Sequence, residues 1–245
     1  MKTSNKLILA ALLLLVISLV RYDYLVKSEF LTGNYKNPYK DFIPLKFKDF
    51  DTINLNSVSA GSVKFVQGPF SVKMSPFGSE FMRLGQQKRT LNIDAVFEYG
   101  YQNTPDPYIL IISCPKIAAL NASARYGTNG KMYIDTIVRD LWNMHTVLID
   151  GFKQDSLNIS QDYGSRVFLS NSSIGSLKAV TGLSPASGPQ LNLLNNNHFD
   201  DINLDIRNRS TVIIDNVPKN KFNYRLDDSA RVILNGAAQN IFKKQ

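Results

Sequence analysis

Val212-Ile213-Ile214-Asp215-Asn216 is followed twenty residues later by Val232-Ile233-Leu234-Asn235-Gly236, and three similar stretches precede this pair. The earlier ones are Val147-Leu-Ile-Asp-Gly151, Val167-Phe-Leu-Ser-Asn171 and Leu191-Asn-Leu-Leu-Asn195. In each stretch two aliphatic residues flank a third residue, and turn-forming residues follow. The five starts lie 20, 24, 21 and 20 residues apart. A regular period of this length, with Gly and Asn at the corners, is typical of a β-solenoid.

A second series of strand-like pairs lies between these stretches. Its members are Leu157/Ile159, Leu177/Ala179, Leu204/Ile206 and Tyr224/Leu226. Residues i and i+2 of a strand share one face, so each pair can point into a common core. Coils stacked about 4.8 Å apart would bury these pairs as continuous columns. The same spacing also fits an ordinary antiparallel sandwich or meander, which is the alternative.

The first half of the chain carries similar pairs with less regular spacing. They are Ile53/Leu55, Val63/Phe65, Val72/Met74, Leu91/Ile93 and Ile109/Ile111, with a hairpin expected over 63–72. We interpret this half as the same solenoid in a looser register. The prediction is therefore one all-β domain, a single β-solenoid over residues 47–240 with about 20 residues per coil.

Composition excludes several classes of protein. The chain has 245 residues and one cysteine, Cys114, which rules out an internal disulfide framework and a cysteine-based metal cluster. The net charge is +8, but lysines and arginines are scattered among acidic residues and form no block. We therefore expect a solvated basic surface and no nucleic acid partner. The sequence gives no indication of a cofactor.

The N-terminus carries an export signal. Fourteen uncharged, mostly apolar residues, 7–20, follow Lys2 and Lys6 and end at Arg21. No cleavage site of small residues follows, so we favour an uncleaved anchor over residues 1–21, with secretion after cleavage as the alternative. Residues 22–46 are rich in aromatics and lysines and are interpreted as a stalk. The expected location is the inner membrane, with the domain facing the periplasm.

Several motifs in the first half resemble a known bacterial family. They are Phe50-Asp-Thr-Ile-Asn-Leu55, Val63-Lys-Phe-Val-Gln-Gly-Pro-Phe-Ser-Val72, Leu91-Asn-Ile93 and Ser113-Cys-Pro-Lys-Ile-Ala-Ala-Leu120. Together they are similar to the family named putative auto-transporter adhesin, head GIN domain, over about residues 47–236. The resemblance implies an exported, solenoid-like protein and no particular chemistry. The chain departs from the name, because no set of long amphipathic strands for an outer-membrane translocator follows the head.

The sequence offers little catalytic machinery. Some solenoid enzymes cleave polysaccharides with paired carboxylates, so Asp200, Asp201, Asp205 and Asp215 are the candidates for a hydrolase or lyase. Their positions in turns and at strand starts favour a structural role instead. The two histidines, His145 and His198, lack the spacing of metal ligands. We therefore predict a non-catalytic binding or structural module of the cell envelope, which the resemblance implies is adhesin-like, with the carbohydrate-active enzyme as the alternative.

One surface feature is unusual. The residues between the inward pairs of the first series are Leu148, Phe168, Asn192, Ile213 and Ile233, of which all but Asn192 are apolar. Those of the second series are Asn158, Lys178, Asp205 and Arg225. Strands that are apolar on both faces are normally covered on both. We therefore predict that this apolar strip is a binding site, covered by the stalk or by a partner. The partner would be a second copy or a protein or glycan of the envelope, and residues 7–20 would contact the membrane.

Overall fold

The computed structural model describes residues 3–33, 36–102, 107–138, 145–215 and 221–242, without the side chains of 241 and 242. Its internal contacts divide the chain into two units, Met1–Phe42 and Ile43–Gln245. The protein is mostly β-structure, with an apolar helix in the first unit.

The first unit contains helix α1, Thr3–Thr32, whose side chains are exposed throughout. Its 30 residues span about 45 Å at 1.5 Å per residue. By length and composition, α1 could cross a membrane. The apolar stretch 7–20 lies inside it, but the helix continues past Arg21. The first part of the expected stalk is therefore helical.

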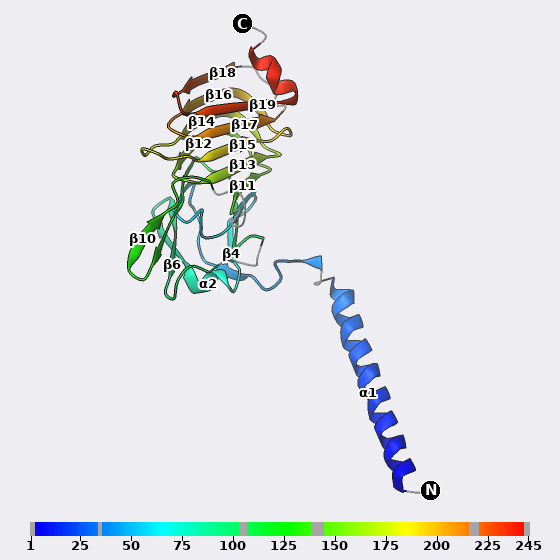
Figure 1. The fold of residues 1–245 in the computed structure, drawn as a ribbon. Helices are drawn as coiled ribbons and strands as arrows, with labels where there is room; N and C mark the ends of the chain where they lie inside the picture. The colour runs from blue at the N-terminus through cyan, green and yellow to red at the C-terminus, as the bar shows by residue number, and fades with distance from the viewer. Residues whose placement is uncertain (1–2, 34–35, 103–106, 139–144, 216–220, 243–245) are drawn as a thin grey trace. The chain divides into compact units, whose positions relative to one another are not determined.

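The second unit consists of strands, two short helical segments and connecting loops (Figure 1). Its elements are β1 Ile43–Leu45, β2 Thr52–Leu55, β3 Val63–Gln67, β4 Ser71–Met74, α2 Gly78–Phe81, β5 Met82–Gln87, β6 Thr90–Phe97, β7 Leu110–Cys114, β8 Ala119–Ser123, β9 Arg125–Thr128, β10 Lys131–Ile134, β11 Val147–Asp150, β12 Lys153–Asp162, β13 Arg166–Ser170, β14 Ser173–Thr181, β15 Gln190–Leu193, β16 His198–Ile206, β17 Thr211–Asp215, β18 Lys221–Leu226, β19 Arg231–Asn235 and η2 Gly236–Phe242.

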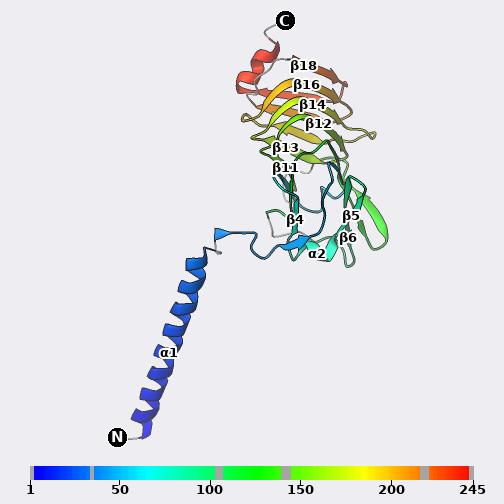
Figure 2. The ribbon, with the colours of Figure 1, turned by 180° about the vertical axis from the view of Figure 1, so that it is seen from behind.

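The described strands form two mixed sheets. Sheet A has the order β1-β4-β7-β3-β11-β13-β15-β17-β19. Sheet B has the order β10-β9-β6-β2-β8-β12-β14-β16-β18, and β5 pairs with β6 outside that order. From β11 onward, successive strands alternate between the two sheets, so each strand lies beside the next but one (Figures 1 and 2). The inner faces of both sheets share one hydrophobic core.

The C-terminal strands stack in parallel register, as the repeat predicts. In sheet A the first series is in register from Val147/Ile149 through to Val232/Leu234. In sheet B, Leu157/Ile159 pair with Leu177/Ala179 as predicted. The next step differs from the prediction, because Leu177 and Ala179 pair with Ile202 and Leu204. The alignment with Leu204/Ile206 was therefore wrong by two residues.

The N-terminal strands do not follow one solenoid. Val63/Phe65 pair in parallel with Leu110/Ile112, so the inward pair of β7 is shifted by one residue from the predicted Ile109/Ile111. Strand β7 also separates β3 from β4, so residues 63–72 do not form the expected hairpin. Antiparallel pairs occur at β1–β4, β4–β7, β5–β6 and β9–β10. The second unit is thus two mixed sheets and not a uniform solenoid.

Corner residues explain how the parallel part turns. Asn171 follows β13 with φ +51° and Gly182 follows β14 with φ +78°. Both angles lie in the left-handed region, which Gly and Asn adopt at least cost. At Gly182 the chain also passes close to the next coil, since a Cβ there would clash with Arg207 O and Ser210 Oγ. Each coil therefore rests directly on the one below.

Candidate binding face

The four residues of the apolar strip lie in one row on the outer face of sheet A. Leu148 pairs with Phe168, and Ile213 pairs with Ile233. Asn192 of β15 lies between the two pairs, opposite both Phe168 and Ile213. Neighbouring strands are about 4.8 Å apart, so the row runs across five adjacent strands over about 19 Å. The parallel register thus gathers residues that are up to 85 positions apart in the sequence.

The strip is open to its surroundings among the described residues. Leu148, Phe168 and Ile213 are half-buried, and Ile233 is 42% exposed. Complete burial of such side chains would stabilise a contact by about 1.5–3 kcal/mol each.

Asn192, the polar residue between the two apolar pairs, forms its side-chain hydrogen bonds within the protein. It is only 4% exposed. Its Oδ1 accepts a hydrogen bond from Gln190 Nε2 at 3.0 Å, and its Nδ2 donates to Val167 O at 3.3 Å. The amide therefore presents little polar surface, and the exposed apolar surface of the row comes from the Leu148/Phe168 pair and the Ile213/Ile233 pair on either side of it.

A pair of charged residues, Lys64 and Asp150, lies at one end of the strip. The row continues from Leu148 to Lys64 of β3, and Lys64 Nζ lies 3.1 Å from Asp150 Oδ2. Asp150 Oδ1 also accepts a hydrogen bond from Asn171 Nδ2 at 2.7 Å. Burial alone would raise the pKa of Asp150, but the bonds from Asn171 and Lys64 outweigh it and lower this pKa below its usual value. The carboxylate therefore stays ionised.

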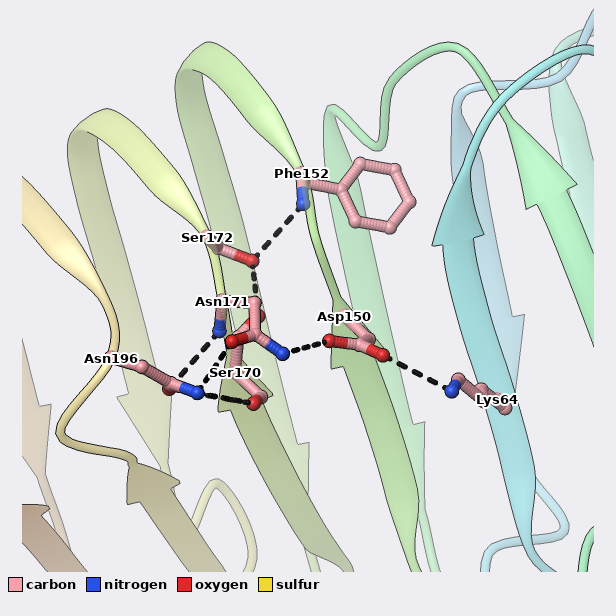
Figure 3. Close-up of polar contacts among 7 residues, drawn as sticks. All are labelled: Lys64, Asp150, Phe152, Ser170, Asn171, Ser172 and Asn196. Carbon is pink, nitrogen blue, oxygen red and sulfur yellow. Dashed lines mark hydrogen bonds and ion pairs between the residues drawn. The ribbon is translucent and has the colours of Figure 1, made fainter.

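A ladder of amide and hydroxyl groups continues from this ion pair along the corner of the stack (Figure 3). Asn196 Nδ2 donates to Asn171 Oδ1 at 2.6 Å, and Asn196 Oδ1 accepts from the backbone N–H of Asn171 at 3.1 Å. Ser172 Oγ donates to Ser170 O and accepts from the N–H of Phe152. These bonds tie three coils together beside the strip, so its backbone is held in place.

The outer face of sheet B is polar along the rows of Asn54 and Asn203. Asn92, Asn54 and Asn121 lie in register on β6, β2 and β8 and are joined by side-chain hydrogen bonds of 2.8 Å. Farther along, Asn223 donates to Asn203 at 3.0 Å. Lys178 lies in the row of Asn158 and Asn203, whereas Asp205 pairs with Arg225 in the adjacent row. The two sheets therefore differ in the surface that they present.

The candidate carboxylates do not come together. Asp200, Asp201 and Asp205 lie on β16 of sheet B, whereas Asp215 lies on β17 of sheet A. The Arg207 guanidinium bonds to Asp205 and lowers the pKa of that carboxyl, the reverse of what a general acid requires. Asp215 Oδ1 accepts a hydrogen bond from Asn235 Nδ2 at 2.6 Å. Within the described residues, no group of three His, Cys, Asp or Glu could hold a metal ion.

A polar pocket that the sequence did not reveal lies beside the start of β11. It has a volume of about 150 Å³ and is lined by Ser59, Tyr101, Tyr126, Asp135, His145 and Arg166, among others. Tyr101 Oη lies 3.0 Å from His145 Nε2. Burial lowers the pKa of His145 to about 4 and raises that of Tyr101 to about 12, so both are neutral at pH 7. Residues 44 positions apart form this contact, and no spacing rule could have indicated it.

The last part of the expected stalk is a strand. Ile43–Leu45 forms β1, which pairs with β4 at the edge of sheet A opposite to β19. These residues extend the sheet and do not cover the strip. Any cover from the stalk would have to come from residues 22–42.

No protein-family model and no curated protein matches the chain. Similar solved structures include a putative adhesin from Bacteroides fragilis, 11% identical, with a TM-score of 0.46 over 79% of this chain and 95% of that chain. A putative lipid binding protein from Parabacteroides distasonis is 11% identical, with a TM-score of 0.37 over 80% of this chain and 94% of that chain. A putative adhesin from Parabacteroides merdae is 9% identical, with a TM-score of 0.27 over 80% and 95%. At these scores the likeness does not bear on what this chain binds.

Proposed function

We propose that the protein is a non-catalytic binding module of the cell envelope, anchored by α1 and facing the periplasm, and that the apolar strip is its binding surface. The observation that carries this proposal is the in-register row of Leu148, Phe168, Ile213 and Ile233 on an otherwise solvent-facing sheet. The stack from β11 to β19 acts as a short solenoid scaffold. Its hydrogen-bonded corners hold the backbone of the row in place, so the entropic cost of ordering the binding surface is small.

The chemistry of the strip favours an apolar protein segment as its ligand. The aliphatic and aromatic side chains of the row have no hydrogen-bond donors with which to recognise the hydroxyl groups of a sugar. One candidate is the chain's own segment 22–42, which supplies Tyr22, Tyr24, Phe30, Tyr35, Tyr39 and Phe42. Another is a protein of the envelope with a complementary apolar surface.

The strip is tested by hydrophobic-dye binding to the second unit, residues 43–245, which has its own core. Phe168→Ser with Ile213→Ser should reduce dye fluorescence. Val180→Ser is the matched control, because Val180 is a half-buried outward residue of sheet B. Equal dye binding by the two variants would refute the strip as a sticky face. The fragment begins at residue 43 because one that began at Phe50 would lack β1, which pairs with β4.

A peptide-binding experiment distinguishes between the two candidate ligands, segment 22–42 and an envelope protein. A labelled peptide of residues 22–42 is titrated with the second unit, and its fluorescence anisotropy is followed. Binding that the Phe168→Ser, Ile213→Ser variant abolishes would identify the stalk as the cover. No binding would leave an envelope protein as the ligand.

The anchor is tested on native protein. If α1 is an uncleaved anchor, intact mass of protein from the membrane fraction should retain residues 1–20, and high salt should not extract it. A mature N-terminus between Val20 and Tyr35 would show that the signal is removed and would contradict the anchoring part of the proposal.

A further inference from the structure

Strand β10 ends sheet B with an open edge. It pairs with β9 through an antiparallel hairpin and with no other described strand. The turn is Asn129-Gly130, with φ of +50° and +70° at its two residues. Positive φ at both positions fixes the tight two-residue hairpin that holds β10 in register. The edge is therefore well ordered and accessible.

The direction of the open backbone groups follows from the hairpin. The N–H of Asp135 donates to Ala124 O at 3.0 Å, and Tyr133 pairs with Tyr126 two residues earlier. Inward and outward bonding alternates along an antiparallel strand. Met132 and Ile134 therefore point their N–H and C=O groups toward the open edge.

The side chains of β10 are as exposed as its backbone. Met132 is 62% exposed, Tyr133 46% and Ile134 45%. Val96 of β6, 41% exposed, lies in the same row as Met132, and Gly127 between them has no side chain. Edge strands are normally protected by several charges, a proline or a bulge, whereas β10 has only Lys131. An open and apolar edge of this kind is a site for strand addition.

We propose that β10 pairs antiparallel with β10 of a second copy of this chain, with Tyr133 on the two-fold axis. In this register Met132 faces Ile134 of the other copy, and those two residues carry the outward backbone groups. Four hydrogen bonds form as a result. The pattern is self-complementary, because the two outward residues lie on either side of Tyr133. Shifting the strands by two residues in either direction loses two of the hydrogen bonds.

The contact between the two β10 strands buries little surface, so its affinity is low. A four-residue strand is about 13 Å long, and one added strand pair buries less than the roughly 1,200 Å² of a stable interface. We therefore expect a weak dimer that depends on concentration. This surface is separate from the apolar strip, and the inference does not rest on the proposed function.

Disulfide trapping of the full chain in detergent micelles tests the register. Facing residues that do not exchange hydrogen bonds have Cα atoms about 4.5 Å apart, so Tyr133→Cys should oxidise to a covalent dimer. Lys131→Cys is the matched control, because its two copies would lie about 13 Å apart, too far for a disulfide. Wild type serves as the blank, since its single cysteine, Cys114, is fully buried.

A second variant tests the backbone bonds. Ile134→Pro, combined with Tyr133→Cys, removes the outward N–H of residue 134 and leaves the bonds between β9 and β10 intact. The dimer yield at limiting protein concentration should fall about tenfold, while the circular dichroism spectrum stays unchanged. Equal yields from Tyr133→Cys and Lys131→Cys, no dimer from Tyr133→Cys, or a yield that the proline does not change would each overturn the proposal.

Discussion

The parallel strands from β11 to β19 and the mixed strands from β1 to β10 use similar sequences to build different pairings. Both parts have short strands with inward aliphatic pairs. In the first part, the corners after β13 and β14 send the chain across to the other sheet before it returns. In the second, two-residue turns at Lys88-Arg89 and Asn129-Gly130 fold the chain back onto its own neighbour. At these places the connection, and not the strand, decides between parallel and antiparallel pairing. The antiparallel pairs β1–β4 and β4–β7, in contrast, join strands that are not consecutive in the chain.

The largest expected effect distinguishes a corner of the stack from a hairpin turn. Gly182 and Gly130 both have positive φ, but only Gly182 has neighbouring atoms where a Cβ would stand. Gly130→Ala should cost about 1 kcal/mol from backbone strain alone, whereas Gly182→Ala should cost about 3 kcal/mol or more. Urea unfolding of residues 43–245 measures both. Similar losses would show that the coils are not in close contact at this corner.

A second effect tests the junction between the two parts, where Tyr101 of the mixed part meets His145 just before β11. The pKa of His145 is about 4 in the folded protein and about 6.5 when unfolded, so the unfolded state binds more protons between these values. Stability should therefore fall as the pH drops from about 6.5 to about 4, by at most about 3 kcal/mol. His145→Gln should flatten this window. Parallel curves for the variant and wild type would contradict the buried neutral histidine.

Core truncation tests the stacking itself. Val212 is fully buried, whereas its neighbour Val232 in the last coil is half-buried. Val212→Ala should cost about 2 kcal/mol and Val232→Ala about 1 kcal/mol, from lost burial and a residual cavity. Because the two side chains share one core, the double variant should deviate from the sum. Strict additivity, measured by urea unfolding, would contradict direct contact between the two side chains.

The smallest effect concerns the polar ladder of sheet B. Asn54 donates to Asn92 and accepts from Asn121, so Asn54→Ala breaks two hydrogen bonds and should cost about 1 kcal/mol. Asn223→Ala breaks one bond at an exposed position and should cost no more than about 0.5 kcal/mol. Thermal unfolding of both variants makes the comparison. If the two variants lost the same stability, the second hydrogen bond of Asn54 would contribute nothing to the stability of the protein.

Two errors of register show where sequence reasoning stops. Ile202, Leu204 and Ile206 alternate along β16, so a slip of two residues leaves apolar side chains on the inner face, and the pattern could not distinguish the two alignments. Ile109-Leu110-Ile111-Ile112 has no alternation, so its inward face could not be read from the sequence. In both cases the partner strand decides. The residues of the strip also lie in apolar runs without alternation, but similar turn residues follow each run at the period of the repeat, and Leu148 pairs with Phe168 and Ile213 with Ile233 as the repeat predicts.

The sequence by itself determined the apolar N-terminal stretch, the strand pairs of the repeat and the row that contains Leu148, Phe168, Ile213 and Ile233, because these depend on local composition and on periods of two and about twenty residues. The tertiary structure decided the mixed pairing of the first strands, the Tyr101–His145 pocket and the open edge at β10. Each of these depends on contacts between residues far apart in the chain or on which strand lacks a neighbour. Local periodicity carries no information about either.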